Sequence, residues 1–101
     1  MAAYIVVDTD WKDTDIETRA AYGRAAQPAI SSYGGRFLTP PGSTAEPLEG
    51  DWDPKILTIL EFPDVEKARQ WWASPEYRPA IAIRRATNAV FKFVLVAGAP
   101  A

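Results

Sequence analysis

Apolar residues recur along the chain with two different periods, which together predict strands and helices in alternation. Runs rich in β-branched and aromatic residues predict strands at Ala3 to Val7, Arg36 to Thr39, Ile56 to Phe62 and Asn88 to Ala97. Apolar residues at helical spacing predict helices at Asp15 to Ser32, Asp64 to Ala73 and, more briefly, Pro79 to Ala86. A Pro/Gly/Ser/Thr-rich loop is expected at residues 40–47.

Local signals mark the ends of the first helix. Thr14 followed by Glu17 has the spacing of a capping box, and Gly34 suits a left-handed C-terminal cap. Pro28 lies inside the pattern and should kink the helix or divide it in two. The stripe expected to face the core consists of Ile16, Ala20, Gly23, Ala26 or Gln27, and Ile30.

The second helix ends in two tryptophans and a turn. Asp64 should cap its start, and Ser74 before Pro75 should end it and serve as the N-cap of another short helical turn. Trp71 and Trp72 point about 100° apart on a helix, so they cannot both fill one core position. One should enter the core, and the other should line a pocket or a dimer interface.

The order strand, helix, strand, strand, helix, strand indicates a single α+β domain over residues 1–101. This βαββαβ order is the ferredoxin-like arrangement, an antiparallel four-stranded sheet with the helices on one face. The first, third and last strands are apolar at both parities, so the second sheet face should also be covered. A two-fold homodimer, with two sheets packed as a dimeric α/β barrel, is the expected solution.

Several segments together resemble an uncharacterised bacterial family, domain of unknown function 1330, in the dimeric α/β-barrel superfamily. The segments that carry the resemblance are residues 33–38 (YGGRFL), 48–52 (LEGDW), 59–63 (ILEFP) and 68–77 (ARQWWASPEY), together with Arg84. The resemblance covers nearly the whole chain and implies the fold and the dimer. It implies no established activity, although the wider superfamily includes cofactor-free monooxygenases, lactone isomerases, polyketide cyclases and haem enzymes.

Composition narrows the chemistry. Cysteine and histidine are both absent, which removes thiolate nucleophiles, disulfides and the usual transition-metal and haem ligands, so no metal or cofactor is expected. The acidic segment after Val7 begins like a calcium loop, but three of its positions do not fit that motif. Position five is Lys12, position six is Asp13 instead of glycine, and position twelve is Arg19 instead of glutamate.

Charge and hydropathy bear on partners and location. The net charge of −2 comes without a basic stripe, which argues against nucleic-acid binding. The longest apolar run, residues 90–97, contains Lys92 and is too short to span a membrane. With no signal-like N-terminal segment, the expected location is cytoplasmic.

The candidate site residues are carboxylates, aromatics and an arginine. Arg84 is expected to hold an anion, Tyr77 and Ser74 to donate hydrogen bonds, and Glu61 or Glu49 to move a proton. The flat aromatic surface for a ligand would come from Trp72, Tyr22 and Trp52.

Each of these assignments has a structural alternative. Glu61 could pair with Arg84, Arg36 or a partner chain, and Glu49 could fix its own loop. Ser74 could act only as a cap, and the aromatics could simply pack the core and the dimer interface.

The leading hypothesis is therefore binding, and cofactor-free conversion, of a small aromatic or oxygenated acid. It competes with a non-catalytic structural dimer and with an accessory protein whose partner is another protein. Paired site residues with no cavity would favour the structural dimer, and an apolar patch outside the dimer interface would favour the accessory protein.

Overall fold

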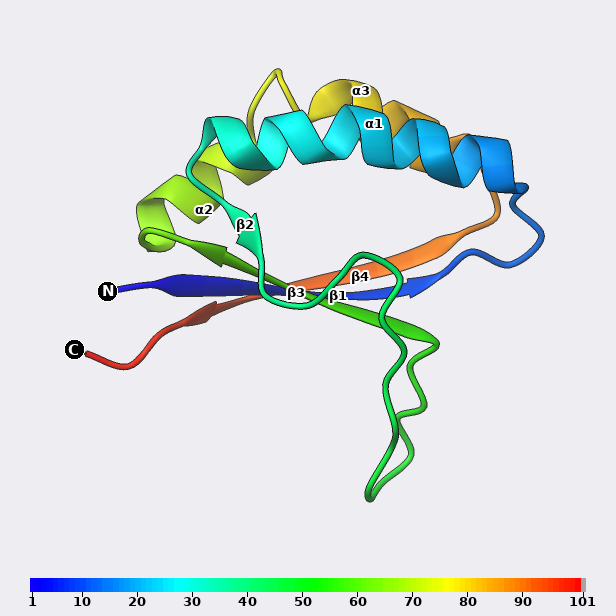
Figure 1. Cartoon of the computed structure of the whole chain (residues 1–101), viewed down its shortest axis with the longest axis horizontal. Coiled ribbons are helices and arrows are strands. Elements are labelled where there is room, and N and C mark those ends of the chain that lie inside the picture. Colours follow the sequence, from blue (N-terminus) through cyan, green and yellow to red (C-terminus); the bar gives the residue numbers. More distant parts are fainter. Residues whose placement is uncertain (101) are drawn as a thin grey trace.

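The computed structural model describes residues 1–100. The elements follow in the order β1 (Ala3–Asp10), α1 (Ile16–Ser32), β2 (Arg36–Phe37), β3 (Ile56–Phe62), α2 (Val65–Trp72), α3 (Arg78–Arg85) and β4 (Val90–Ala97). The strands form one antiparallel sheet in the order β2-β3-β1-β4. All three helices cover the same face of this sheet (Figure 1). The predicted ferredoxin-like α+β fold is confirmed.

The register of the central strand β1 separates a helix-covered face from an open face. Ile5 lies opposite Leu60 of β3 and Leu95 of β4, on the face beneath the helices. The next residue, Val6, lies opposite Ile59 and Val94 on the open face, where Val94 is 57% exposed. Phe62, Trp71 and Tyr77 are the largest fully buried side chains, so the core lies between the helices and the sheet.

Helix α1 begins one residue later than the capping-box pattern predicts. Asp15 is the N-cap, and its carboxylate accepts a 2.8 Å hydrogen bond from the Thr18 N–H. The Thr14 hydroxyl is buried and has no partner within residues 1–100. The prediction of Thr14 as cap was wrong because the neighbouring carboxylate, a charged acceptor, takes the orphan N–H instead.

Pro28 does not divide α1, which runs without interruption from Ile16 to Ser32. Pro28 is exposed, so water can bond the backbone carbonyl that the proline leaves without its helical donor. The expected left-handed glycine after the helix is confirmed, since Gly34 has φ +77°.

Removing the Asp15 cap is expected to destabilise the protein. Asp15→Ala should lower the melting temperature by about 4–8 °C, whereas Thr14→Val should leave it unchanged or raised, because it removes an unpartnered hydroxyl. The hydrogen bonds from Thr18 lower the pKa of Asp15, so its contribution is present above the unfolded pKa and is lost as pH falls through the folded one. Thermal melts at pH 7 and pH 3 check both statements; equal losses for the two variants at pH 7 would contradict the assignment.

The second helical region matches prediction at α2, at the turn that Ser74 begins and, to within one residue at each end, at α3. The Asp64 carboxylate accepts from the Lys67 N–H at 2.8 Å and caps α2 as expected. Ser74 is buried, donates to the Trp71 carbonyl at 2.8 Å and accepts from the Tyr77 N–H at 3.2 Å. Ser74 therefore stabilises the turn between the helices, while α3 itself starts after Tyr77 without a side-chain cap.

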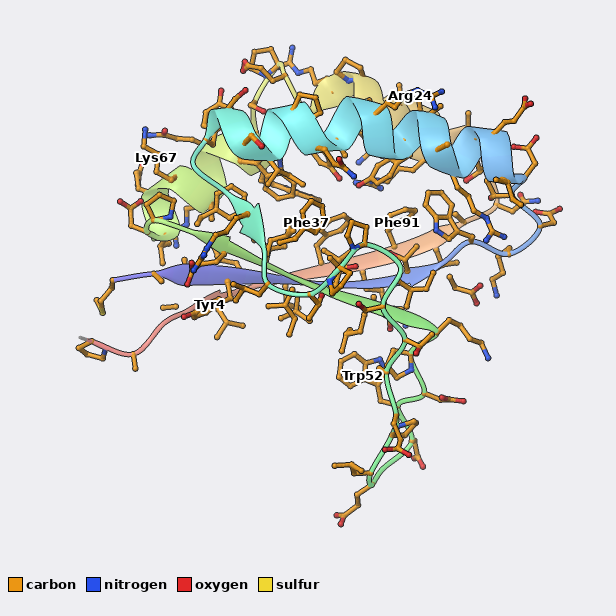
Figure 2. The ribbon with its side chains drawn as sticks, in the orientation of Figure 1. Tyr4, Arg24, Phe37, Trp52, Lys67 and Phe91 are labelled. Carbon is orange, nitrogen blue, oxygen red and sulfur yellow. The ribbon has the colours of Figure 1, made fainter. Side chains whose placement is uncertain are left out.

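Residues 45–55 form a long excursion that we call the arm. A β-bridge between Thr44 and Ile56 closes its base, and the indole N–H of Trp52 donates to Asp8 of β1 at 2.8 Å. The arm projects away from the helices, beyond the open face of the sheet, with Trp52 near the sheet (Figures 1 and 2). The sequence predicted a loop at residues 40–47 and a turn at residues 48–52, and the structure joins both in one excursion that ends at Lys55.

None of the helices within residues 1–100 has the length and apolar character needed to cross a membrane.

Candidate functional site

A cavity of about 520 Å³ lies between α1 and the helix-covered face of the sheet, and we call it the α1 cavity. The α1 residues that face it include Ala20, Gly23 and Ala26, whose side chains are too small to fill the space between the helix and the sheet. This is the stripe that the sequence predicted to be buried. It faces the sheet as expected, but it borders an open space, and Ile16 at its start is 79% exposed.

Aromatic side chains form much of the cavity wall. Trp11, Tyr22 and Phe91 contact one another with ring centroids 5.0 to 5.7 Å apart, and Phe93 stacks on Phe91 at 5.9 Å. Phe37 and Phe91 lie between α1 and the sheet in Figure 2, where both are labelled. Such walls suit a flat ligand, because ring faces offer large contact areas.

Partly buried Tyr22, which borders the cavity, contacts fully buried Tyr77 behind it. The hydroxyls of Tyr22, from α1, and Tyr77, from the turn before α3, are 2.7 Å apart. Tyr77 has no exposed surface and no other hydroxyl partner within residues 1–100, so it must donate to Tyr22 to avoid an orphaned buried O–H. The Tyr22 oxygen then accepts this bond and keeps its own proton free for another acceptor.

Burial, the largest influence, raises the pKa of Tyr22 well above its usual value, against the lowering effect of Arg84. Tyr22 is therefore a neutral hydrogen-bond donor at physiological pH. A second donor at the α1 cavity is the indole N–H of Trp71, which is buried without a partner within residues 1–100.

Arg84 lies behind Tyr22 on aromatic ring faces. Its guanidinium carbon is 5.2 Å from the Phe91 ring centre, 5.1 Å from that of Phe93 and 6.0 Å from that of Trp72. The Arg84 Nε atom is buried without a partner in the described chain. A fixed positive charge thus sits beside the Tyr22 hydroxyl, in surroundings of low polarity.

The charges that line the α1 cavity are all positive. Arg19 and Arg24 of α1 border it, and Arg19 is held by an Nε hydrogen bond of 2.9 Å to the Thr14 carbonyl. No aspartate or glutamate within residues 1–100 borders the cavity. This charge balance favours a ligand with an acidic group. The described residues also contain no cluster of three or more carboxylates that could hold a metal ion.

The structure brings three of the predicted site residues together and separates the others. Tyr22 borders the α1 cavity, and Tyr77 and Arg84 lie next to Tyr22 behind the cavity wall. Trp71 is the core tryptophan, 1% exposed, and it also borders the cavity. Trp72 is 43% exposed and lies outside, against Arg84. Ser74 stabilises the turn between α2 and α3 and does not border the cavity.

The two predicted carboxylates lie outside the cavity. Glu61 is on the open face of the sheet and pairs with Arg36, Nε to Oε1 at 2.7 Å, which was one of its structural alternatives. Glu49 and Trp52 belong to the arm. Within one protomer, these three residues do not reach the α1 cavity.

Sequence reasoning missed several residues that border the cavity: Trp11, Arg19, Arg24, Phe37, Phe91 and Phe93. A signal existed for Phe91 and Phe93, which share one strand face, and for Arg19, which is one residue before Ala20 of the predicted stripe. Trp11 stands in a loop without periodicity, so no local pattern could place it.

The family is settled by comparison with known sequences. The profile of a family described as Domain of unknown function (DUF1330) matches residues 2–99. The chain belongs to the DUF1330 family. No protein with curated annotation matches this DUF1330 sequence significantly.

Solved structures share the fold of this DUF1330 protein at low sequence identity. A protein of unknown function from Rhodopseudomonas palustris is 22% identical, with a TM-score of 0.70 over 99% of this chain and 84% of its own. SnoaB, a cofactor-independent oxygenase from Streptomyces nogalater, is 16% identical, with a TM-score of 0.65 over 99% and 95%. A dimeric ferredoxin-like protein of unknown function from Thermobifida fusca is 15% identical, with a TM-score of 0.60 over 97% and 92%.

Proposed function

We propose that the protein binds a small, flat aromatic or oxygenated acid in the α1 cavity and converts it without a cofactor, by chemistry of the monooxygenase, isomerase or cyclase kind. The observation that carries the proposal is an aromatic-walled cavity whose charged groups are all cationic and whose inner wall holds Tyr22. Its volume, about 520 Å³, falls within the range of roughly 300–1,000 Å³ common for small-molecule sites.

In this proposal the cationic wall acts on the ligand's own acidic group. Arg19 attracts the anion at the α1 side, and Tyr22 donates its free O–H to a ligand oxygen at the inner wall. The Arg84 charge behind Tyr22 favours negative charge on that oxygen. The pKa of a ligand enol or phenol would fall, so the ligand would release its proton to water and react as its anion.

This route assigns no proton transfer to Glu61 or Glu49. Both lie outside the α1 cavity of their own protomer, and Glu61 is already ion-paired. Tyr77 keeps a role through its hydrogen bond to Tyr22, which leaves the Tyr22 proton available to the ligand. SnoaB, which shares the fold, is a cofactor-independent oxygenase, and that activity fits the proposal by analogy.

The proposal includes a homodimer formed through the open face of the sheet. Val90, Val94 and Val96 of β4 are 42%, 57% and 48% exposed on that face, and Val6 and Ile59 continue the apolar surface across it. Structural relatives from Thermobifida fusca and Bacteroides fragilis are described as dimeric. Burying this face against its copy would remove a contiguous apolar surface from water.

Binding of an aromatic acid is tested with 2-naphthoate, followed by quenching of tryptophan fluorescence. Tyr22→Phe and Arg84→Ala should each weaken binding by about tenfold or more, because the first removes the hydrogen-bond donor to the charged ligand oxygen and the second removes the positive charge behind that donor. Neutral naphthalene should bind more weakly than 2-naphthoate. Native mass spectrometry of gently purified protein should show a small-molecule adduct that Arg84→Ala loses.

The matched control is Glu61→Gln, which alters a carboxylate outside the cavity and should bind 2-naphthoate like the wild type. Equal binding by all variants, or no binding by the wild type, would contradict the α1 site. That result would favour the rival hypothesis of a non-catalytic structural or accessory dimer.

A further inference from the structure

The arm carries four acidic residues, of which Asp51 and Asp53 share a pocket with Lys12, Lys55 and Lys92, whereas Glu46 and Glu49 lie outside that pocket. Its acidic residues are Glu46, Glu49, Asp51 and Asp53, against one basic residue, Lys55. None of these acidic residues forms a salt bridge within residues 1–100. Leu48, between two of the glutamates, is 91% exposed. An acidic segment with an exposed leucine at its centre has the composition of a docking segment.

A groove with the complementary character lies on the helix layer, between α2 and α3. This α2–α3 groove measures about 460 Å³ and is bordered by Trp72, Ala73, Ser74, Arg78, Ile81, Ala82 and Arg85. Arg78 and Arg85 are exposed and form no salt bridge in the described part of the chain. Because the arm projects from the opposite face of the sheet (Figure 1), it cannot reach the groove of its own protomer.

We propose that the arm of one copy docks into the α2–α3 groove of a second copy. The inference rests on the homodimer of the proposed function. Arg78 and Arg85 are seven residues apart on a helix, about 10.5 Å along its axis. Glu46 and Glu49 are three residues apart, about 10 Å in extended chain. The two spacings match, so Glu46 and Glu49 can form ion pairs with Arg78 and Arg85. Leu48 would then contact Trp72 and Ile81 between these two ion pairs.

A homodimer whose two-fold axis runs parallel to the strands would bring these segments together. The sheet has two edges, β2 and β4, and a two-fold axis parallel to the strands sets the β2 edge of one copy beside the β4 edge of the other. The arm follows β2, and α3 leads directly into β4. The partner's arm therefore arrives on the side of the molecule where α3 lies.

The arm is also long enough to reach the helix layer of the partner. Half of its eleven residues reaches about 17 Å when extended. Facing sheets pack about 10 Å apart, so the tip passes the partner's sheet and enters its helix layer. Because the axis is two-fold, both arms make the same contact and the assembly closes as a dimer.

The absence of cysteine allows a direct test, since introduced thiols are the only ones in the chain. The variant with Leu48→Cys and Ala82→Cys joins the arm tip to an exposed groove position. Its control pairs Leu48→Cys with Glu66→Cys, an exposed α2 position outside the groove. Under mild oxidation the first variant should give a covalent dimer with at least tenfold higher yield than the second, while sedimentation reports the dimer itself.

The outcomes separate the two proposals. A dimer with selective 48–82 cross-linking supports the inference. A dimer whose two variants cross-link equally, or not at all, overturns the docked arm and leaves the homodimer standing. A monomer overturns the homodimer and the arm contact with it.

A charge exchange gives an independent check. Glu46→Arg with Glu49→Arg, or Arg78→Glu with Arg85→Glu, should each raise the dimer Kd by about tenfold, and the fourfold variant should restore it. Lys67→Glu with Arg69→Glu, on the exposed face of α2, is the matched control and should leave the Kd unchanged. If the fourfold variant does not recover the wild-type dimer Kd, the pairing of arm and groove is overturned.

Discussion

Trp71→Ala is expected to lower the free energy of unfolding by about 3–5 kcal/mol. Trp71 is 1% exposed, and its ring contacts those of Tyr77 at 4.5 Å, Phe62 at 5.3 Å and Phe93 at 6.4 Å. Truncation removes the side chain that joins α2 to the sheet and merges the vacated volume with the α1 cavity. Urea unfolding followed by far-UV circular dichroism measures the loss at fixed protein concentration.

The adjacent tryptophan supplies the control. Trp72 is 43% exposed, so Trp72→Ala should cost no more than about 1–2 kcal/mol, since only part of its surface leaves water on folding. If Trp71→Ala does not fold, Trp71→Phe replaces it, with a smaller loss that still exceeds that of Trp72→Phe. Equal costs for the two positions would contradict the assignment of Trp71 to the core.

Gly35→Ala should lower the free energy of unfolding by roughly 1–3 kcal/mol through overpacking. A Cβ atom at this position would lie 2.6 Å from Cε1 of Phe62 and 2.7 Å from Cγ2 of Ile30. Both neighbours are buried, at 0% and 4% exposure, so neither can move without disturbing the core. Thermal and urea unfolding of the variant measure the change.

Gly23→Ala is the matched substitution and should have the opposite sign. Gly23 lies inside α1, and the nearest atom to an added Cβ is Nε2 of Gln27 at 3.9 Å. Alanine in a helix is favoured over glycine by about 0.5–1 kcal/mol, so stability should rise. If Gly23→Ala lowers the free energy of unfolding, or Gly35→Ala raises it, then the close contacts around Phe62 do not determine the stability of these variants.

The sequence was sufficient for the fold because its strands carry a strong periodic signal. β3 begins and ends at the predicted residues, Ile56 and Phe62, and its Leu60 and Phe62 face the helices as the alternation required. Apolar residues at both parities of β1 and β4 also indicated that both faces of the sheet are apolar. These properties are local, so they can be read from neighbouring residues.

The candidate site was harder to predict from the sequence, because it depends on distances between helices and strands. Small residues in the stripe of α1 predict burial, but whether they close onto the sheet or leave a cavity depends on how far apart α1 and the sheet lie. The choice of Arg36 rather than Arg84 as the partner of Glu61 follows from strand pairing, since Arg36 lies directly opposite Glu61 in the sheet. The loop and the turn that make up the arm were predicted, but their projection as one excursion was not, because the path of a loop is not encoded in a periodic pattern.

The pairing of β1 with β4 has a consequence for how the molecule is made. β1 is bonded to β4 along its whole length, from Ala3 opposite Ala97 to Asp10 opposite Val90, and the Gly98 N–H donates to the Ala2 carbonyl at 2.8 Å. The central strand therefore lacks one neighbour until the last strand has left the ribosome. Phe91 and Phe93, which line the α1 cavity, arrive with that strand. Because the two ends lie side by side (Figure 1), a circular permutant that joins them and opens at the arm would make β4 an early strand and should fold along a different route.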